Sequence, residues 1–463
     1  MGQKVMPQGI SGDIVLKSGQ KERAEPAEMW YTVIVKNPVI PTITEVLLMT
    51  NYSTLGHNLK RGIFNFCRKI AGGFHRPIQK FITDMVYGLI SAKSCHLTEI
   101  ARKLNEDTAL DKTVERLSRN LMNFEGEKAV TENYMNTVKP HFDERTVLII
   151  DDGDVSKPYS RKLEGICRVK DGSSGEITDG YWSAGVSALT AEHKQPIPVY
   201  SRVYSTKEKE YVSNNAETIK SLEFLSSHFP KTNIRALDRG YDGGYIFDYF
   251  IPRGESFIVR MKEKRNVIHK GKTLLLGDVA KKYKGNYELR FEAQDGKKAT
   301  CKISIAPISL PAYPDTPLNL VVCNGLGKEP LMLLTNVDSD DPRLCVTITK
   351  VYLMRWRIEE FYRFKKQGFG FEKFLVRTLK SIRNLDLMLT VAIGYIGILS
   401  EKIDESIEVR EIVEASKRLY GLSKFTFYAI SDGLAEIFSK SYSGIRSLLR
   451  IPPPSPQMIL PGW

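Results

Sequence analysis

The stretch Thr146–Asp152, TVLIIDD, decides the fold class of this chain of 463 residues. The four consecutive apolar side chains that precede the two carboxylates predict a strand buried on both faces of a sheet. Asp151 and Asp152 stand at the end of this strand. Because successive strand residues point to opposite faces, only one of the two carboxylates can face a shared site, and the two-sided apolar run does not choose between them.

The segments after this strand alternate between strand and helix patterns. They are the strands Tyr181–Leu189, Ile197–Tyr204, Ile234–Asp238 and Ser256–Met261, a helix over Asn215–Phe229, and a second helix that opens at Asp242. The basic, glycine-rich segment Lys157–Gly180 is predicted to be a loop. Three strands followed by alternating strands and helices predict an α/β core built on a mixed sheet.

Residues 263–335 interrupt this alternation with further strand patterns at Tyr287–Ala293, Ala299–Ile305 and Leu318–Cys323. We therefore expect a β-rich insertion, after which Leu331–Asn336 leads back to the core. The chain then divides into six segments: 1–60, unassigned apart from a strand pattern at Trp30–Val35; 61–140, helical; 141–262, first part of the core; 263–335, β-strand insertion; 336–400, second part of the core; and 401–463, a C-terminal helical region with a proline-rich tail.

The helical segment 61–140 contains short amphipathic patterns at Thr98–Leu104 and Thr113–Leu121. Several arginine and lysine residues fall on their polar faces. This arrangement suits a small DNA-binding domain, for example a helix-turn-helix, but any small helical bundle would have the same pattern.

The composition limits the class of protein and of partner. Hydrophobic residues make up 42% and charged residues 26%, as in a soluble globular protein, and the net charge is +13. A basic excess of this size suggests a polyanionic partner, either nucleic acid or an anionic membrane. The most apolar run, Leu385–Leu399, is shorter than a bilayer span and contains Asp386, so we expect a buried helix and no membrane partner.

The six cysteines are widely scattered and form no C-x-x-C pair, which argues against a zinc site or a disulfide framework. Reduced thiols in a cytosolic protein are expected, and the N-terminus lacks the layout of a signal peptide. The sequence also lacks a glycine-rich phosphate loop that ends in lysine and a nucleophilic Ser/His/Asp pattern.

A second informative stretch is Tyr352–Lys366, YLMRWRIEEFYRFKK. At about 100° per residue, an α-helix over this stretch places one carboxylate, Glu359, among cations and an aromatic ring on one face. The opposite face is mainly apolar and can pack on a core. A metal-dependent site that cuts phosphodiesters needs such a combination, although a surface helix with ion pairs such as Glu359–Arg363 is the simpler alternative.

Three carboxylates thus stand at the ends of core elements: Asp152 or Asp151 after one strand, Asp238 after another, and Glu359 on a helix. Three acidic groups brought together are stable in the ionised form only with cations between them, and two Mg²⁺ ions about 3.5–4 Å apart would meet this need. Each residue also has a simpler interpretation, because Asp238 can cap a helix or pair with Arg239, and Asp151 and Asp152 can form a polar turn.

The spacing of Tyr352, Arg355, Glu359 and Lys366 matches a Y-(2)-R-(3)-E-(6)-K signature. In this the chain resembles insertion-sequence transposases of the DDE type, the cut-and-paste enzymes with an RNase H-like catalytic domain. The stretch LDRGYDGGYIFDYF around Asp238 resembles the second aspartate motif of that family. The first motif often has an aspartate followed by glycine or threonine and then a hydroxyl residue, which Asp152-Gly153-Asp154 matches in part and which favours Asp152 over Asp151.

The resemblance implies a DNA transposase that uses two Mg²⁺ ions, or Mn²⁺ in their place, for strand cleavage at insertion-sequence ends and for strand transfer. Its implied partners are double-stranded DNA, as terminal inverted repeats and target, and a second copy of the chain on paired ends. The implied location is the cytoplasm of a prokaryote, at the nucleoid. The implied residues are Asp152, Asp238 and Glu359 for catalysis and metal binding, and Tyr352, Arg355, Trp356, Arg363, Lys366 and Arg239 for DNA binding.

The sequence departs from the family at one position. Some relatives have a base-stacking tryptophan just before the Leu-Leu-Thr run, and this chain has Leu331 there. Two other functions fit the same residues. One is an RNase H-like nuclease or resolvase that does not transpose, and the other is a transposase-derived DNA-binding protein without catalytic activity. Inverted repeats beside the gene distinguish the first alternative, and metal binding distinguishes the second.

Overall fold

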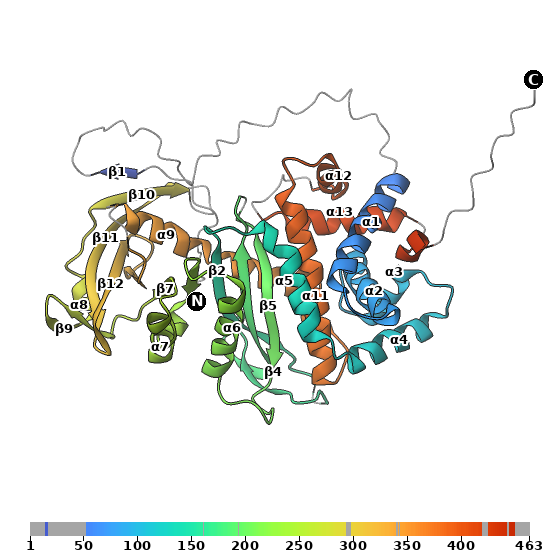
Figure 1. Ribbon diagram of the computed structural model, residues 1–463, viewed down its shortest axis with the longest axis horizontal. Helices are drawn as coiled ribbons and strands as arrows, with labels where there is room; N and C mark the ends of the chain where they lie inside the picture. The colour runs from blue at the N-terminus through green and yellow to red at the C-terminus, as the bar shows by residue number, and fades with distance from the viewer. Residues whose placement is uncertain are drawn as a thin grey trace, which may run out of the picture.

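The computed structural model describes residues 14–16, 52–160, 162–192, 194–292, 298–338, 341, 343–418, 425–441 and 444–449. The strand pattern at Trp30–Val35 and the proline-rich tail lie outside the described residues. Figure 1 shows a central sheet with the β-insertion on one side and a group of helices on the other.

The core sheet has the strand order β5–β4–β2–β6–β7. Here β2 (Val147–Ser156) pairs antiparallel with β4 (Ile177–Leu189), which pairs antiparallel with β5 (Pro196–Tyr204). On the other side, β6 (Ile234–Leu237) runs parallel to β2, and β7 (Phe257–Arg260) runs parallel to β6. The first four residues of β2 are buried, as the apolar run predicts for a strand covered on both faces. This topology confirms the predicted mixed-sheet, RNase H-like core.

Helices connect these strands. Helix α6 (Asn214–His228) begins where the Ser213 hydroxyl accepts a hydrogen bond from the Ala216 N–H. A short 3₁₀ turn, η2 (Arg239–Tyr241), follows β6, and helix α7 (Gly244–Arg253) ends at Gly254, which has a positive φ of 63°. The predicted loop Lys157–Gly180 is wrong in part, because it contains β3 (Cys167–Lys170), which pairs with the start of β4.

The β-insertion continues the same sheet. Strand β13 (Leu331–Thr335) pairs antiparallel with β7, and β12 (Tyr313–Asn324), β11 (Lys298–Leu310), β10 (Tyr287–Glu292) and β1 (Ile14–Leu16) follow in that order. A hairpin of β8 (Asn266–His269) and β9 (Lys272–Leu275), and the short helix α8 (Leu276–Ala280), complete it. The predicted β-rich insertion is confirmed.

The remaining elements are helical. The N-terminal group consists of α1 (Tyr52–Ile70), α2 (Arg76–Ala92), α3 (Leu97–Leu104), α4 (Leu110–Asn123), α5 (Glu127–Val138) and η1 (Lys139–His141). The C-terminal group consists of α9 (Leu344–Met354), α10 (Arg357–Arg363), η3 (Phe364–Gly368), η4 (Phe371–Lys373), α11 (Leu379–Glu401), α12 (Ile407–Ala415), α13 (Phe427–Lys440) and η5 (Ile445–Leu449).

Helix α11 joins these two groups to the sheet. By length and composition it is the one helix of the described residues that is apolar enough to cross a membrane, but 89% of its most apolar window is buried. It packs on β5 and on α2, α4 and α13, and the Asn384 amide donates to the backbone carbonyls of Leu121 (2.8 Å) and Phe124 (3.1 Å). The expectation of a buried helix is therefore confirmed.

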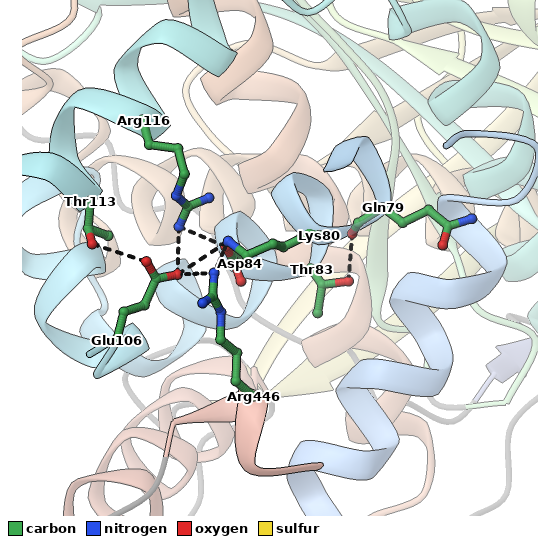
Figure 2. A network of polar contacts seen from close by, with 8 residues as sticks. All are labelled: Gln79, Lys80, Thr83, Asp84, Glu106, Thr113, Arg116 and Arg446. Atoms are coloured by element: carbon green, nitrogen blue, oxygen red, sulfur yellow. Dashed lines mark hydrogen bonds and ion pairs between the residues drawn. The ribbon is translucent and has the colours of Figure 1, made fainter. Parts of the chain in front are cut away.

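A network of charged side chains fastens the C-terminal segment to the N-terminal helices (Figure 2). Two buried carboxylates lie at its centre, Asp84 of α2 and Glu106 of the α3–α4 turn. Arg116 of α4 lies 2.9 Å from Asp84 and 2.7 Å from Glu106, and Arg446 of η5 also forms an ion pair with Glu106. Helices α2 and α4, the turn between α3 and α4, and the C-terminal turn η5 therefore share one set of ion pairs.

We expect Glu106→Gln to loosen this junction, because it removes one of the two buried carboxylates that face Arg116 and Arg446, and breaking a buried pair costs about 3–5 kcal/mol. Glu115→Gln is the matched control, since Glu115 also pairs with two cations on α4, Lys112 and Arg119, but is exposed. Amide hydrogen exchange should rise in α2, α4 and η5 for Glu106→Gln alone. Equal exchange in the two variants would contradict this role of Glu106.

Candidate active site

The stretch Tyr352–Lys366 is not one α-helix, so that expectation is wrong in part. Helix α9 ends at Met354 and α10 begins at Arg357. Between them the Arg355 N–H donates to the Tyr352 carbonyl (3.0 Å) and the Glu359 N–H donates to the Trp356 carbonyl (3.0 Å). These bonds span three residues, so the backbone tightens but stays right-handed. Tyr352, Arg355 and Glu359 therefore still lie near one another.

The guanidinium of Arg355 joins two carboxylates. Its Nη1 lies 3.2 Å from Oδ2 of Asp151, and its Nη2 lies 3.0 Å from Oε1 of Glu359. Only 7% of the Arg355 side chain is exposed, and its guanidinium lies 5.9 Å from the ring of Tyr352. Burial alone would lower the pKa of Arg355, but the carboxylates, led by Asp151, hold its pKa above the ordinary value.

The backbone brings Asp238 beside Asp151. In the parallel pair of β2 and β6, Ile150 lies opposite Leu237, so the next residues along the two strands are Asp151 and Asp238. Burial raises the pKa of Asp151 to about 7; Arg355 opposes this shift, and the carboxylates of Asp238, Asp152 and Glu359 add to it. Asp151 and Glu359 thus pair with one buried arginine, and Asp238 lies near enough for its charge to act on Asp151 and Arg355.

Asp152 faces the other side of the sheet, as the alternation of strand side chains requires. Its surroundings are Tyr241 of η2 and Glu217 and Thr218 of α6, and burial raises its pKa to about 6. The preference for Asp152, which came from the Asp-Gly-Asp resemblance, is therefore corrected: the carboxylate of β2 that lies with Asp238 and Glu359 is that of Asp151.

The donor set suits a hard divalent cation. In the part of the chain that the structure describes, no three His, Cys, Asp or Glu side chains converge closely enough to hold a metal ion as they stand. The Arg355 guanidinium lies between Asp151 and Glu359 and provides the positive charge. Three carboxylates are the oxygen ligands that Mg²⁺ and Mn²⁺ prefer, and an ionised, buried Asp151 gains from a cation, so these residues fit such ions once the guanidinium withdraws.

The other residues expected to contact DNA lie around this group. Arg363 pairs with Glu360 (2.7 Å), and its guanidinium lies 5.9 Å from the ring of Trp356, which is half-buried. Arg239 is exposed beside Asp238.

Lys366 is held away from solvent by two carboxylates, Asp154 and Glu372, each at 2.9 Å. Burial opposes its charge, yet Glu372 and Asp154 keep its pKa above the ordinary value. In this conformation Lys366 fastens the end of the Glu359 helix to β2 and to η4.

Tyr362, which the sequence reasoning missed, seats α10 on the sheet. Its hydroxyl donates to the backbone carbonyl of Asp151 (2.8 Å). Its ring lies over Gly153 of β2 and Gly185 of β4, and a Cβ at Gly185 would lie only 2.2 Å from the Tyr362 hydroxyl oxygen. A glycine inside a strand often marks such a close approach, so these two glycines were the signal available in the sequence.

A buried ion pair fixes the next turn. The Lys365 ammonium pairs with Asp386 of α11 and donates to the Ser201 hydroxyl of β5 (3.1 Å), which itself donates to Asp386 (2.7 Å). Both charged side chains are almost fully buried. Ion pairs therefore hold the helix that carries Glu359 on both sides of Tyr362. Arg355 pairs with Asp151 before it, and Lys365 pairs with Asp386 after it.

We expect Gly185→Ala to displace Tyr362 and to weaken Mn²⁺ binding by about 10-fold or more, as losses in the support of metal ligands typically do. Gly394→Ala is a matched control, because a Cβ at Gly394 would lie 2.0 Å from the Tyr134 hydroxyl oxygen, away from the carboxylates. Both variants should lower the melting temperature, but only Gly185→Ala should change Mn²⁺ affinity in calorimetry. Equal affinities would show that Tyr362 does not position the carboxylates.

Residues 144–394, more than half of the sequence, match the family model described as "Transposase DDE domain". No curated protein matches the chain. Among solved structures, the chain is similar to the piggyBac transposase in its synaptic complex with hairpin DNA, with 10% identity, 81% of this chain and 74% of that chain covered, and a TM-score of 0.41.

The matched segment includes Asp151, Asp238 and Glu359 together with the sheet and the helix that bring them to one place. The chain belongs to the family of the transposase DDE domain.

Proposed function

We propose that this protein is a DNA transposase that cleaves strands at the ends of an insertion sequence and joins the freed 3′ ends to target DNA, with Mg²⁺ as its cofactor. The family assignment supports a transposase in general. The observation that carries the finer proposal is that Asp151 and Glu359 pair with the Arg355 guanidinium, with Asp238 near enough for its charge to act on both Asp151 and Arg355.

The residues proposed to hold two Mg²⁺ ions, or Mn²⁺ in their place, are Asp151, Asp238 and Glu359. Bound there, the ions supply Lewis-acid chemistry that lowers the pKa of an attacking water or 3′-hydroxyl and stabilises the leaving oxygen. The side chains of this protein position those ligands from two parallel strands and one helix, and Tyr362 and Lys365 keep the helix in place.

The cations of the Glu359 helix have separate tasks in this proposal. Arg355 neutralises the carboxylates when no metal is bound, and it is free to donate to a backbone phosphate once the metal provides that charge. Arg363, Trp356 and Arg239 are accessible and contact the flanking strand. Lys366 stays bound between Asp154 and Glu372 and anchors the helix. The ring of Tyr352 packs near the guanidinium of Arg355 and supports it.

The proposed partners are double-stranded DNA, as terminal inverted repeats and as target, and a second copy of the chain on the paired ends. The proposed setting is the nucleoid of a prokaryotic cytoplasm. A transposase that handles two DNA ends at once requires both copies in one complex, so sedimentation of the protein with its own DNA ends should give a dimer.

A DNA-binding protein without cleavage is the second candidate, and one observation favours it. The guanidinium of Arg355 lies where a cation between Asp151 and Glu359 would lie. Absence of Mn²⁺ binding in calorimetry would support this candidate against the transposase.

The decisive experiment combines the purified protein, Mg²⁺ and a duplex that carries the DNA flanking its own gene. We expect strand cleavage by the wild type and none by Asp151→Asn or Glu359→Gln, because each removes a metal ligand. Asp152→Asn is the matched control and should still cleave, since its side chain faces α6. Cleavage by Asp151→Asn, or its loss in Asp152→Asn alone, would refute the assignment of Asp151.

The affinity for Mn²⁺ should depend on pH. A ligand must be ionised to bind the metal, and the pKa of Asp151 is raised to about 7, so the ionised fraction grows by about 10-fold from pH 6 to pH 8. We therefore expect the dissociation constant to fall by a similar factor over this range, measured by calorimetry at buffered free Mn²⁺. A constant value would show that Asp151 is not among the ligands.

A further inference from the structure

Three large apolar side chains are unusually exposed at one end of the core. They are Tyr159 in the loop after β2, Leu375 after η4 and Ile177 at the start of β4, with exposed fractions of 96%, 73% and 67%. A single exposed apolar side chain is common, but three that gather in one place mark an interaction surface.

Lys157 gathers the three segments that carry them. Its buried ammonium donates to the backbone carbonyls of Glu372 and Phe374, each at 2.9 Å. Its backbone N–H donates to the carbonyl of Asp179 (2.7 Å). Each exposed apolar residue lies within two positions of Lys157 or of one of these contacts, so the three residues lie on neighbouring segments at this end of the sheet.

Cations surround these apolar side chains. Lys170 lies directly opposite Ile177 in the pairing of β3 with β4, and directly opposite residues share a face of a sheet. Lys373 and Arg377 flank Leu375 along the chain. All three cations are exposed, and none forms an ion pair with another described residue. The Lys157 surface consists of Tyr159, Lys170, Ile177, Lys373, Leu375 and Arg377.

Acidic groups also lie near these cations, and some of them pair with cations outside the surface. Asp179 pairs with Arg168 (3.1 Å), and Glu372 pairs with Lys366 (2.9 Å). Asp171 accepts a hydrogen bond from the Ser173 N–H (2.7 Å) in the β3–β4 turn, and Glu176 is exposed beside Ile177, so both carboxylates keep their negative charge. The six residues of the Lys157 surface include three cations, an exposed aromatic ring and no acidic side chain, which is the combination that binds a nucleic-acid backbone and its bases.

This surface is continuous with the candidate active site. Asp154 accepts hydrogen bonds from Lys366 (2.9 Å) and from the Gly172 N–H of the β3–β4 turn (3.0 Å). Lys157 directly follows β2 and lies six residues beyond Asp151, about 20 Å at about 3.3 Å per strand residue, which corresponds to about six base pairs of B-DNA. A duplex lying across the carboxylates would reach the Lys157 surface a few base pairs away.

We propose that the Lys157 surface binds the duplex that flanks the cleavage point, with Lys170, Lys373 and Arg377 on phosphates and Tyr159 and Leu375 against exposed base or sugar edges. This inference rests on the proposed transposase function, which it deepens by placing the flanking DNA. Lysine is depleted at protein–protein interfaces, and this favours DNA over a second copy of the chain as the occupant.

The test compares two triple charge reversals. K170E/K373E/R377E changes the Lys157 surface, and K139E/K231E/K402E changes three exposed lysines near the starts of β2 and β6 and the end of α11, at the opposite end of the sheet. We expect the first variant to bind a duplex of the protein's own DNA end with flank at least about 10-fold more weakly and with a smaller dependence on salt. The control should bind as the wild type does.

A photo-crosslinking benzoylphenylalanine at position 159 locates the contact directly. We expect it to crosslink to the flank of the same duplex, whereas the same group at Ile407, which is also exposed, should not. Mn²⁺ binding by the triple variants should equal that of the wild type, which establishes that the active site is folded.

The outcomes separate the two proposals. If the wild type neither binds nor cleaves the duplex, the proposed function fails. If the wild type cleaves but both triple variants bind equally and position 159 gives no crosslink, the Lys157 surface is not a DNA site. A change in oligomeric state for K170E/K373E/R377E, seen by sedimentation, would instead show that this surface joins two copies, and would overturn the proposal.

Discussion

The ion pairs of Arg355 are the interaction on which the rest of the site depends. Two carboxylates, Asp151 and Glu359, come from elements more than 200 residues apart and would repel each other in a partly buried setting. One guanidinium, itself almost fully buried, holds both. The charge of the guanidinium therefore offsets the repulsion between the two carboxylates where the strand and the helix meet.

Arg355 can pair with both carboxylates only because the helix that carries Glu359 has a fixed position on the sheet. Tyr362 reaches the carbonyl of Asp151 through space that Gly153 and Gly185 leave open, and Lys365 reaches Asp386 in the interior. A buried charge pair of this kind contributes little net stability, but it strongly disfavours any other position of the helix. Positional precision at the site thus derives from packing and buried charge on the side of the helix that faces away from solvent.

Much of this arrangement was accessible from the sequence. The apolar run before Asp151 and the spacing of the later strands predicted the sheet, and the cations around Glu359 predicted a charged helix face. The sequence did not predict which face of β2 carries the site, because both faces of that strand are buried and the alternation of side chains does not distinguish them. The elements that pack against β2 determine which carboxylate belongs to the site. The parallel strand β6 places Asp238 beside Asp151, and helix α6 places Glu217 near Asp152.

The junction of core and insertion has a consequence for how such a chain can change in evolution. Strand β13 forms backbone hydrogen bonds directly with β7, and all five of its residues are buried. Loss of the insertion would leave β7 with a row of unpaired amide and carbonyl groups, open to pairing with any passing strand and so to aggregation. The insertion therefore keeps the β7 edge of the catalytic sheet paired, and removal of its outer strands would leave that pairing intact.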